Sequence, residues 1–263
     1  IQRRFTLFDK GSNQQLTLLS SFPRDCNVAV IGASGGVGQA FVELLADDEK
    51  VGGVYAFSRS PIESDQDKVR GHIHDLTDEA SISAAANGAA AERPLDLVIV
   101  ASGILHRGSE IRPEKSMREI DPQSMSDVFA VNTIGPALVA KHFLPKLSKG
   151  GKTAFAAISA RVGSIGDNRL GGWASYRMSK AALNMLLKTA SIEHARTRPE
   201  SVVVALHPGT VDTNLSQPFT RRVEPAKLFS PAYSAGQLLK VIDSVGPEDT
   251  GGFFAYDKSR VDF

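Results

Sequence analysis

Short apolar runs alternate with amphipathic stretches along most of the chain. Within most of these runs, apolar residues follow one another directly instead of alternating with polar residues. This pattern is typical of strands that are buried on both faces in a parallel sheet. We expect seven such strands, at residues 28–31, 54–57, 71–74, 97–101, 153–158, 202–207 and 253–256.

Helix start signals lie between the expected strands. Thr77 is expected to cap a helix, because Asp78 and Glu79 follow it at the positive end of the helix dipole. Pro122 after Asp121 is a second start signal, because proline fits the first helical position. The expected helices cover residues 37–46, 77 onward, 121–147, 176–195 and 230–246. The repeated strand–helix order predicts the α/β class, with a single Rossmann-type doubly wound domain, a seven-stranded parallel sheet and right-handed crossovers.

The first residues of the chain do not fit this repeat. Two arginines stand before an apolar patch, as in a signal peptide, but Asp9 and the polar residues 12–15 interrupt the patch. We therefore expect an N-terminal extension over residues 1–26, whose role the sequence leaves open, followed by one domain over residues 27–263.

Composition excludes several classes of protein. The 263 residues include 30 Lys plus Arg and 29 Asp plus Glu, a formal net charge of +1, so a nucleic-acid-binding surface is not expected. No apolar run approaches the roughly 18 residues of a membrane span. The single cysteine, Cys26, excludes an intramolecular disulfide and a cysteine-based zinc site, and fits a reducing, cytoplasmic location. His72 and His74 alternate on an expected strand, and that spacing alone does not make a metal site.

A glycine-rich segment links the first expected strand to the first expected helix. Residues 31–38 read Ile-Gly-Ala-Ser-Gly-Gly-Val-Gly. Glycines at such a turn let the backbone approach a pyrophosphate, whose charge then lies at the helix N-terminus. A plain glycine-rich turn is the alternative, and the strand before it and the helix after it favour cofactor binding. The candidate cofactor residues here are Gly32, Ser34, Gly35, Gly36, Val37 and Gly38.

The choice between the two nicotinamide cofactors depends on the end of the second strand. The acidic residue that holds a ribose 2′-hydroxyl lies about 20 positions after the glycines. Ser58, Arg59 and Ser60 stand there, with no acidic residue among them. A guanidinium flanked by hydroxyls can hold a 2′-phosphate, so NADP(H) is favoured and NAD(H) is the alternative. The alternative is an arginine that only contacts solvent after a strand, which would give the same sequence pattern.

Tyr176 and Lys180 are spaced one helical turn apart on a single helix face. A tyrosine with a pKa near 10 is a poor acid–base group at neutral pH, and a nearby ammonium group lowers that pKa. Ser159, at a strand end, could polarise a carbonyl, and Asn132 stands inside a helix before Gly-Pro. Taken singly, these residues could equally be packing, capping or solvated groups.

The chain resembles the short-chain dehydrogenase/reductase family over residues 27–256. The residues that carry the resemblance are Gly32, Gly36 and Gly38; Asp75 and Leu76 after the third strand; Asn132, Ser159, Tyr176 and Lys180; and the segment 208–213 with Pro208, Gly209, Val211 and Thr213. The runs at residues 101–106, 159–165 and 227–231 are most similar to the C-factor-like and carbonyl-reductase-like branch.

The resemblance implies a mechanism and a cofactor. It implies hydride transfer between NADP(H) and a small carbonyl or alcohol substrate, with Tyr176 as general acid and base. Lys180 would lower the tyrosine pKa and hold the nicotinamide ribose, Ser159 would position the carbonyl, and Asn132 would open its helix and hold a water. Residues 27–263 would then be a dinucleotide-binding catalytic domain. The remaining implied cofactor contacts are Asp75, Leu76, Ala101, Ser102, Gly103, Pro208, Gly209, Val211 and Thr213.

The resemblance also implies a homodimer or homotetramer built on helices 121–147 and 176–195, with no membrane or nucleic-acid partner. The alternative is an NAD(P)-binding sensor or signalling protein of the C-factor kind with little turnover. The complete set of Asn132, Ser159, Tyr176 and Lys180 favours the enzyme, because a binding module has no chemical need for all four.

Two features depart from the family pattern. Ile31 stands where the family usually has Thr, and Val100 and Ala101 stand where it has an Asn-containing turn. Because both partners of a polar pair have become apolar together, we interpret this as a change of packing. Ser159 and Tyr176 are also 17 positions apart, about four more than usual, through an insertion within residues 166–173. Pocket-wall candidates are Leu105, His106, Trp173 and residues 215–229, each with ordinary loop packing as the alternative.

Overall fold

A seven-stranded parallel sheet organises the part of the chain that the structure, a computed structural model, describes, residues 17–263. Its order is β3-β2-β1-β4-β5-β6-β9. The strands are β1 (Cys26–Ile31), β2 (Val51–Ser58), β3 (Val69–Ile73), β4 (Leu97–Val100), β5 (Thr153–Ile158), β6 (Ser201–His207) and β9 (Phe253–Ala255). All seven expected strands are confirmed, with ends that differ by three residues or fewer.

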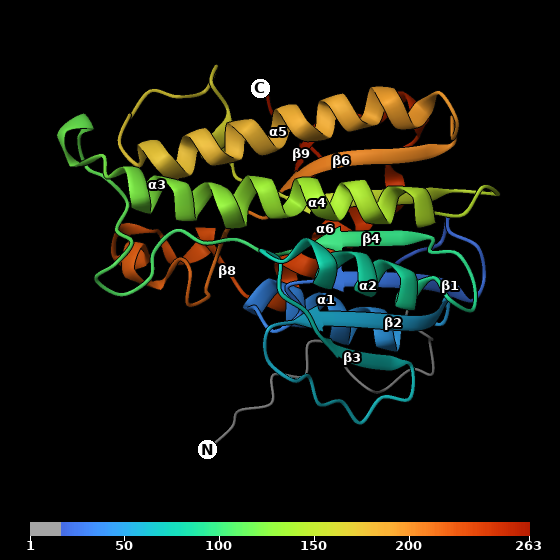
Figure 1. The fold of residues 1–263 in the computed structure, drawn as a ribbon. Coiled ribbons are helices and arrows are strands. Elements are labelled where there is room, and N and C mark those ends of the chain that lie inside the picture. Colours follow the sequence, from blue (N-terminus) through green and yellow to red (C-terminus); the bar gives the residue numbers. More distant parts are fainter. Residues whose placement is uncertain (1–16) are drawn as a thin grey trace.

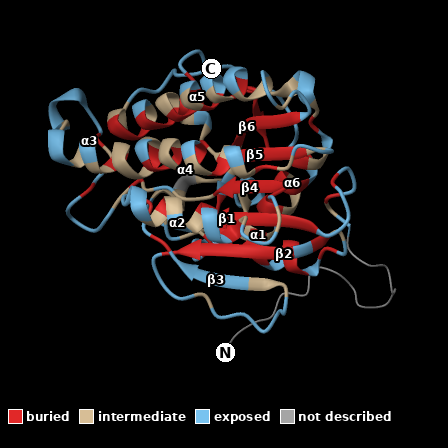
Figure 2. Ribbon diagram, turned by 45° about the vertical axis from the view of Figure 1, so that its right-hand side comes forward, coloured by how far each residue is buried: buried red, intermediate tan, exposed pale blue. Residues whose placement is uncertain are grey.

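Helices cover both faces of this sheet (Figure 1). Helices α1 (Gly36–Asp47) and α6 (Pro231–Ser244) pack together on one face. Helices α2 (Glu79–Ala89), α4 (Gly135–Phe143) and α5 (Ala174–Ala195) lie on the other. Successive strand residues enter different cores, so the sheet is the buried middle layer in Figure 2, except for the exposed edge strand β3. The expected doubly wound fold is confirmed.

The helix starts follow the predicted signals with one correction. Asp121 caps α3 (Pro122–Phe129) by accepting from the Ser124 N–H at 2.7 Å, as expected. The expected cap at Thr77 is wrong, because Asp78 caps α2 by accepting from the Ala80 N–H. The N–H and hydroxyl of Thr77 instead donate to the Asp75 carboxylate.

The helix expected over residues 121–147 is not regular. After α3 it passes through a π-helical segment, Ala130–Ile134, before continuing as α4 and a short 3₁₀ turn, Leu144–Lys146. A π-helical segment carries one extra residue in the turn and often marks a functional site. Asn132 lies at its centre and is fully buried.

Part of the expected N-terminal extension belongs to the core. Leu19 and Phe22 are buried against α1 and α6 residues. The Asp48 carboxylate accepts from the Leu18 and Leu19 N–H groups at 2.7 and 3.0 Å, and the hydroxyls of Ser20 and Ser21 donate to Asp243. Residues 1–16 of that extension lie outside the described residues. Packing of the domain therefore begins before the expected boundary at residue 26.

The strand order fixes where a ligand can enter. The chain runs outward from β1 to β2 and β3, then returns to β4 on the other side of β1. Connections leaving β1 and β4 therefore diverge, and the crevice at their carboxyl ends is the usual ligand site of such sheets. A two-stranded sheet that the sequence did not predict, β7 (Thr210–Val211) with β8 (Leu228–Phe229), follows β6.

Candidate active site

The glycine loop and the segment after β4 meet very closely at the switch point. Gly32 has φ +89°, and a Cβ added there would lie 2.6 Å from Ser102 Oγ. Gly38 is equally restricted, because an added Cβ would lie 2.1 Å from the Gly32 carbonyl oxygen. Only glycine fits both positions, so the loop backbone is tightly folded at the start of α1.

The N-terminus of α1 suits a pyrophosphate. Its cap residue, Gly35, has no side chain to accept from the first N–H groups, and the first turn contains no acidic residue. Gly36 faces Thr213, since an added Cβ would lie 2.7 Å from Thr213 Cγ2. Uncapped N–H groups at the positive helix end, beside a cradle that a side chain would fill, fit a dinucleotide. Ser34 is exposed and Val37 is half-buried at this loop.

Arg59, the expected 2′-phosphate ligand, is exposed at the end of β2. Its guanidinium makes no hydrogen bond or ion pair within residues 17–263. It acts electrostatically on Asp75, whose pKa is lowered mainly by hydrogen bonds from Thr77 and also by Arg59. Ser58 is less available than expected, because its hydroxyl donates to the Ser60 carbonyl oxygen at 2.5 Å.

The remaining predicted contacts frame the same crevice. Leu76 packs on Gly135 at the start of α4, where a Cβ would lie 2.5 Å from Leu76 Cγ. The Ala101 N–H donates to the Ile31 carbonyl oxygen at 2.8 Å. Ile31 pairs with Val100 in the sheet, and both are buried in one core. The interpretation of a polar pair replaced by apolar packing is confirmed.

The segment expected along the nicotinamide, residues 208–213, is held by contacts with Ser216, Phe229 and Ser234. Gly209 has φ +77°, and an added Cβ would lie 2.6 Å from the Phe229 ring. The Pro208 carbonyl oxygen accepts from the Ser234 hydroxyl at 2.8 Å. Val211 is buried, and its carbonyl oxygen accepts from the hydroxyl of Ser216. The Thr213 N–H faces the same hydroxyl at 3.3 Å, so Ser216 organises this turn.

Tyr176 and Lys180 are both buried on α5. Lys180 Nζ lies 5.9 Å from the centroid of the Tyr176 ring and donates to the Ile158 carbonyl oxygen at 2.9 Å. Burial lowers the pKa of Lys180 to about 8 and raises the pKa of Tyr176 above its ordinary value. The Tyr176 hydroxyl has no hydrogen-bond partner among the described residues. A protonated phenol therefore stands beside a cation whose charge is easily lost.

Asn132 joins the π-helical segment to the segment after β4. Its Oδ1 accepts from the Ile104 N–H and its Nδ2 donates to the Ile104 carbonyl oxygen, both at 2.8 Å. Nδ2 also lies 3.1 Å from Ser179 Oγ. A Cβ added to Gly103 would lie 3.5 Å from both Asn132 Oδ1 and Lys180 Nζ. Asn132 Oδ1 and Lys180 Nζ therefore both lie close to Gly103.

The Ser159 hydroxyl is not free to polarise a substrate carbonyl, which is the role expected of it. Its hydroxyl donates to Asn184 Oδ1 at 2.7 Å, and both side chains are buried. A serine has one hydroxyl proton, so that proton is already used. Ala160 follows with extended backbone, φ −147° and ψ 145°, so its methyl group points to the opposite side of the chain. Neither residue offers a free hydroxyl proton to a carbonyl in this arrangement.

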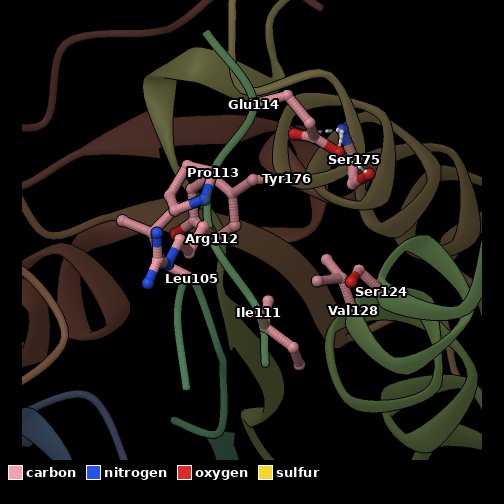
Figure 3. A pocket seen from close by; sticks show the side chains of 9 residues that line it. All are labelled: Leu105, Ile111, Arg112, Pro113, Glu114, Ser124, Val128, Ser175 and Tyr176. Atoms are coloured by element: carbon pink, nitrogen blue, oxygen red, sulfur yellow. Dashed lines mark hydrogen bonds between the residues drawn. The ribbon is translucent and has the colours of Figure 1, made fainter. Parts of the chain in front are cut away.

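A small chamber surrounds the Tyr176 side chain (Figure 3). Its volume of about 10 Å³ is close to that of one water molecule. Its apolar lining includes the buried residues Leu105, Ile111 and Val128. Glu114, a buried carboxylate that no sequence pattern points to, also lines this chamber. Its position in a polar stretch between a strand and a helix gives no signal of burial.

Aromatic rings from three segments form a cluster beside Tyr176. Trp173 packs edge-on against Tyr176 at 6.4 Å between centroids and against Phe219 at 5.0 Å. His106 packs against Phe219 at 5.8 Å, and its Nε2 lies 3.0 Å from the Asn214 carbonyl oxygen. Trp173 and His106 pack in this cluster without lining the chamber, whereas Leu105 does line it. Leu170 in the same insertion is 91% exposed.

No helix within residues 17–263 is long and apolar enough to cross a membrane. No group of three or more His, Cys, Asp or Glu side chains in that range could hold a metal ion.

Known proteins share both the sequence and the fold of this chain. A family model described as short chain dehydrogenase matches residues 27–224. The chain is 38% identical to the C-signal of Myxococcus xanthus over 147 residues. The aligned region covers 56% of this chain and 82% of the C-signal. The chain is 30% identical over 228 residues to 1-hydroxy-2-glutathionyl-2-methyl-3-butene dehydrogenase of a Rhodococcus species, covering 86% and 94% of the two chains.

The fold is similar to a solved carbonyl reductase. The crystal structure of the NADPH-bound carbonyl reductase from chicken fatty liver matches with a TM-score of 0.79 and 28% sequence identity. The match covers 96% of this chain and all of that one.

Proposed function

The chain belongs to the short-chain dehydrogenase family, and on this premise we propose that it transfers a hydride between NADP(H) and a small carbonyl or alcohol substrate. The observation that carries the proposal is the buried pair on α5, with Lys180 Nζ 5.9 Å from the Tyr176 ring at the carboxyl end of the sheet. Burying a lysine disfavours its charged form, so a buried lysine in such a site is a candidate catalytic residue.

Tyr176 is the proposed general acid for carbonyl reduction. Burial holds its pKa above the ordinary value, so the phenol keeps its proton at neutral pH. A proton that stays on until negative charge develops on a carbonyl oxygen is what a general acid needs. For alcohol oxidation the phenolate is needed instead, and the Lys180 cation beside the ring stabilises it.

NADP(H) is the proposed cofactor, with NAD(H) as the alternative. When bound, the cofactor supplies the hydride, while the protein supplies orientation and electrostatics. The glycine loop and the uncapped N-terminus of α1 would hold the pyrophosphate, and Leu76 would contact the adenine. Arg59 is the proposed 2′-phosphate ligand, supported by its exposure and by the lack of a described protein partner for its guanidinium.

The roles proposed for the polar groups around Tyr176 are supported to different degrees. Asn132 is proposed to hold the segment after β4 in place and, through the free lone pair on Oδ1, a water between itself and Lys180. Ser159 can polarise the carbonyl only if its hydroxyl leaves Asn184. We therefore assign the proton donation to Tyr176 and give Ser159 a supporting position at the end of β5.

A homodimer or homotetramer is part of the proposal. Met178, Met185 and Ile192 stand seven residues apart on α5, and their side chains are 47%, 68% and 53% exposed. Seven-residue spacing places them in one stripe along the helix.

We also propose a cytoplasmic location. It is supported by Cys26, the single cysteine of the chain, which is buried and whose thiol pKa is raised by burial.

A signalling protein that binds the nucleotide with little turnover is the second candidate. The observation that favours it is the 38% identity to a protein called C-signal. Fluorescence titration with NADPH and NADH, followed by NADPH oxidation over aldehydes, ketones and quinones, separates the two. Turnover that Tyr176→Phe abolishes supports the enzyme. Tight binding with no turnover on any carbonyl favours the second candidate, and no binding of either nucleotide contradicts both.

A further inference from the structure

Helix α5, which carries Tyr176, begins without a capping side chain of its own. Its cap residue is Trp173, which has left-handed backbone, φ 55° and ψ 41°, and makes no side-chain capping bond. A helix N-terminus leaves four N–H groups without intrahelical partners, and a buried one needs acceptors from elsewhere. Ser175, the second helical residue, is buried.

Glu114 supplies those acceptors from a distant segment. Both carboxylate oxygens lie 3.3 Å from the Ser175 N–H, and the Ser175 hydroxyl donates to Oε1. The Glu114 carbonyl oxygen accepts from the Trp173 N–H at 2.5 Å. Figure 3 shows the Glu114 side chain directed at Ser175, the residue before Tyr176. One residue thus holds the backbone on both sides of the helix start.

The Glu114 carboxylate is buried without a cationic side chain. Its side chain is part of a residue that is 5% exposed, and no Lys, Arg or His among the described side chains forms an ion pair with it. The positive end of the α5 dipole and the two Ser175 donors are what compensate its charge. Replacing the carboxylate with a neutral amide removes the negative charge that faces the helix dipole and leaves one acceptor oxygen for the two Ser175 donors, directly beside Tyr176.

Glu114 also ties α5 to the segment on the substrate side of the chamber. Residues 105–115 run from the end of β4 past the chamber, and Leu105 and Ile111 line it. Arg107 anchors the same segment to α3 through Asp127 at 2.7 Å. The segment is therefore fixed to two helices, and its bond to α5 is made by Glu114.

We propose that Glu114 is a positioning residue, whose carboxylate caps α5 from outside the helix and holds Tyr176 in register with the substrate-side segment 105–115. This rests on the proposed function, since it assumes that Tyr176 transfers the proton. Displacement of a reacting group by about 1 Å lowers a rate by up to about a hundredfold. The effect is expected in kcat, because Glu114 does not touch the cofactor loop.

The test compares Glu114→Gln with a matched control, Glu119→Gln, five residues further along the chain. Glu119 accepts from the Lys115 N–H at 2.8 Å but is exposed and makes no bond to α5. Glu114→Gln is expected to lower kcat about tenfold while the Kd for NADPH stays within about twofold. Glu119→Gln is expected to leave both unchanged. Ser175→Ala should lower kcat in the same direction, and the double variant should lose less than the product of the two losses.

Trp173, the single tryptophan of the chain, gives a readout that needs no turnover. Its emission and the hydrogen exchange of the Ser175 amide are expected to change in Glu114→Gln and not in Glu119→Gln. A kcat within about twofold of wild type in Glu114→Gln, with unchanged emission and exchange, overturns the proposal. If the wild type reduces no carbonyl, the proposed function is what fails, and emission and exchange alone decide whether Glu114 holds the helix start.

Discussion

The hydroxyl of Ser159 donates to Asn184 Oδ1 over 2.7 Å, and both residues are buried. The one proton of that hydroxyl is therefore used within the protein. We expect Ser159→Ala to lower kcat/KM by less than about tenfold, and Tyr176→Phe to lower it by about a hundredfold or more. Steady-state NADPH oxidation on one carbonyl substrate measures both losses.

Ala160→Ser is the complementary variant. It adds a hydroxyl on the opposite side of the chain from Asn184, with its proton free. We expect kcat/KM to rise in this variant. Ser159→Ala losing as much activity as Tyr176→Phe would contradict the assignment, because it would mean that the hydroxyl leaves Asn184 during the reaction.

The buried Lys180 predicts the alkaline side of the pH profile. Burial lowers its pKa to about 8, so the cation beside Tyr176 is present below that pH and is lost above it. We expect kcat/KM for carbonyl reduction to fall as pH rises through about 8. Lys180→Met should have low activity with no such step. A wild-type profile that is level from pH 7 to about 10 would contradict this role, since an ordinary lysine titrates near 10.4.

Arg59 predicts cofactor preference. Its exposed guanidinium, beside Asp75, is the cationic group at the end of β2. We expect Arg59→Ala to weaken NADPH binding about tenfold or more and to leave NADH binding nearly unchanged, because only NADPH carries the 2′-phosphate. Fluorescence titration measures both constants. Equal weakening of the two nucleotides would indicate that Arg59 acts elsewhere than on the ribose.

His74 predicts sensitivity to acid. Its Nε2 is the one side-chain nitrogen or oxygen in the described part of the chain that is itself fully shielded from solvent and has no hydrogen-bond partner, and burial lowers the pKa of His74. Because the unfolded chain binds the proton more readily, His74 makes stability fall as pH drops below about 6.5. His74→Phe removes the unpaired nitrogen of a ring that packs against Phe57, so we expect equal or greater stability, by up to about 1–3 kcal/mol.

Urea unfolding at pH 7 and pH 5 measures the His74 effect. The variant should lose less stability between the two values than the wild type does. His207, whose pKa is lowered to about 4 by burial, stays unchanged in both proteins and so cancels in the comparison. An identical loss in the two proteins would show that His74 is not the group that titrates.

Phe22 predicts that residues before β1 stabilise the domain. Its side chain is 2% exposed and lies in the core between α1 and α6, with Lys152 Nζ 5.2 Å from its ring. We expect Phe22→Ala to lower the free energy of unfolding by about 3–5 kcal/mol. Chemical denaturation measures it, with exposed Phe263→Ala as the comparison. A change below about 1 kcal/mol would make this segment peripheral to the domain.

Much of the fold could be predicted because both faces of most strands are buried, which leaves continuous apolar runs in the sequence; the edge strand β3 is the exception. The α2 start was misassigned by one residue because Thr77 and Asp78 both have capping side chains. Asp75 decides between them by accepting from Thr77. Local sequence does not reveal such a competition for donors.

The site could be predicted only where a spacing implies a geometry. Tyr176 and Lys180 are four residues apart on one helix, so their proximity follows from the helix itself. The engagement of Ser159 by Asn184 and the capping of Ser175 by Glu114 join residues 25 and 61 positions apart. Such contacts depend on how α5 and the segment after β4 pack together, which no local pattern records.

The π-helical segment at residues 130–134 separates two helices that face different neighbours. Helix α3 packs against α5 near the Tyr176 end, whereas α4 packs against both α2 and α5. Each residue turns an α-helix by about 100°, so deleting one residue from this segment would rotate α3 by that angle relative to α4. Asn132 would then lose its alignment with Ile104. Deletion of a single residue here would therefore rotate the wall of the chamber that α3 forms, while leaving every strand of the sheet intact.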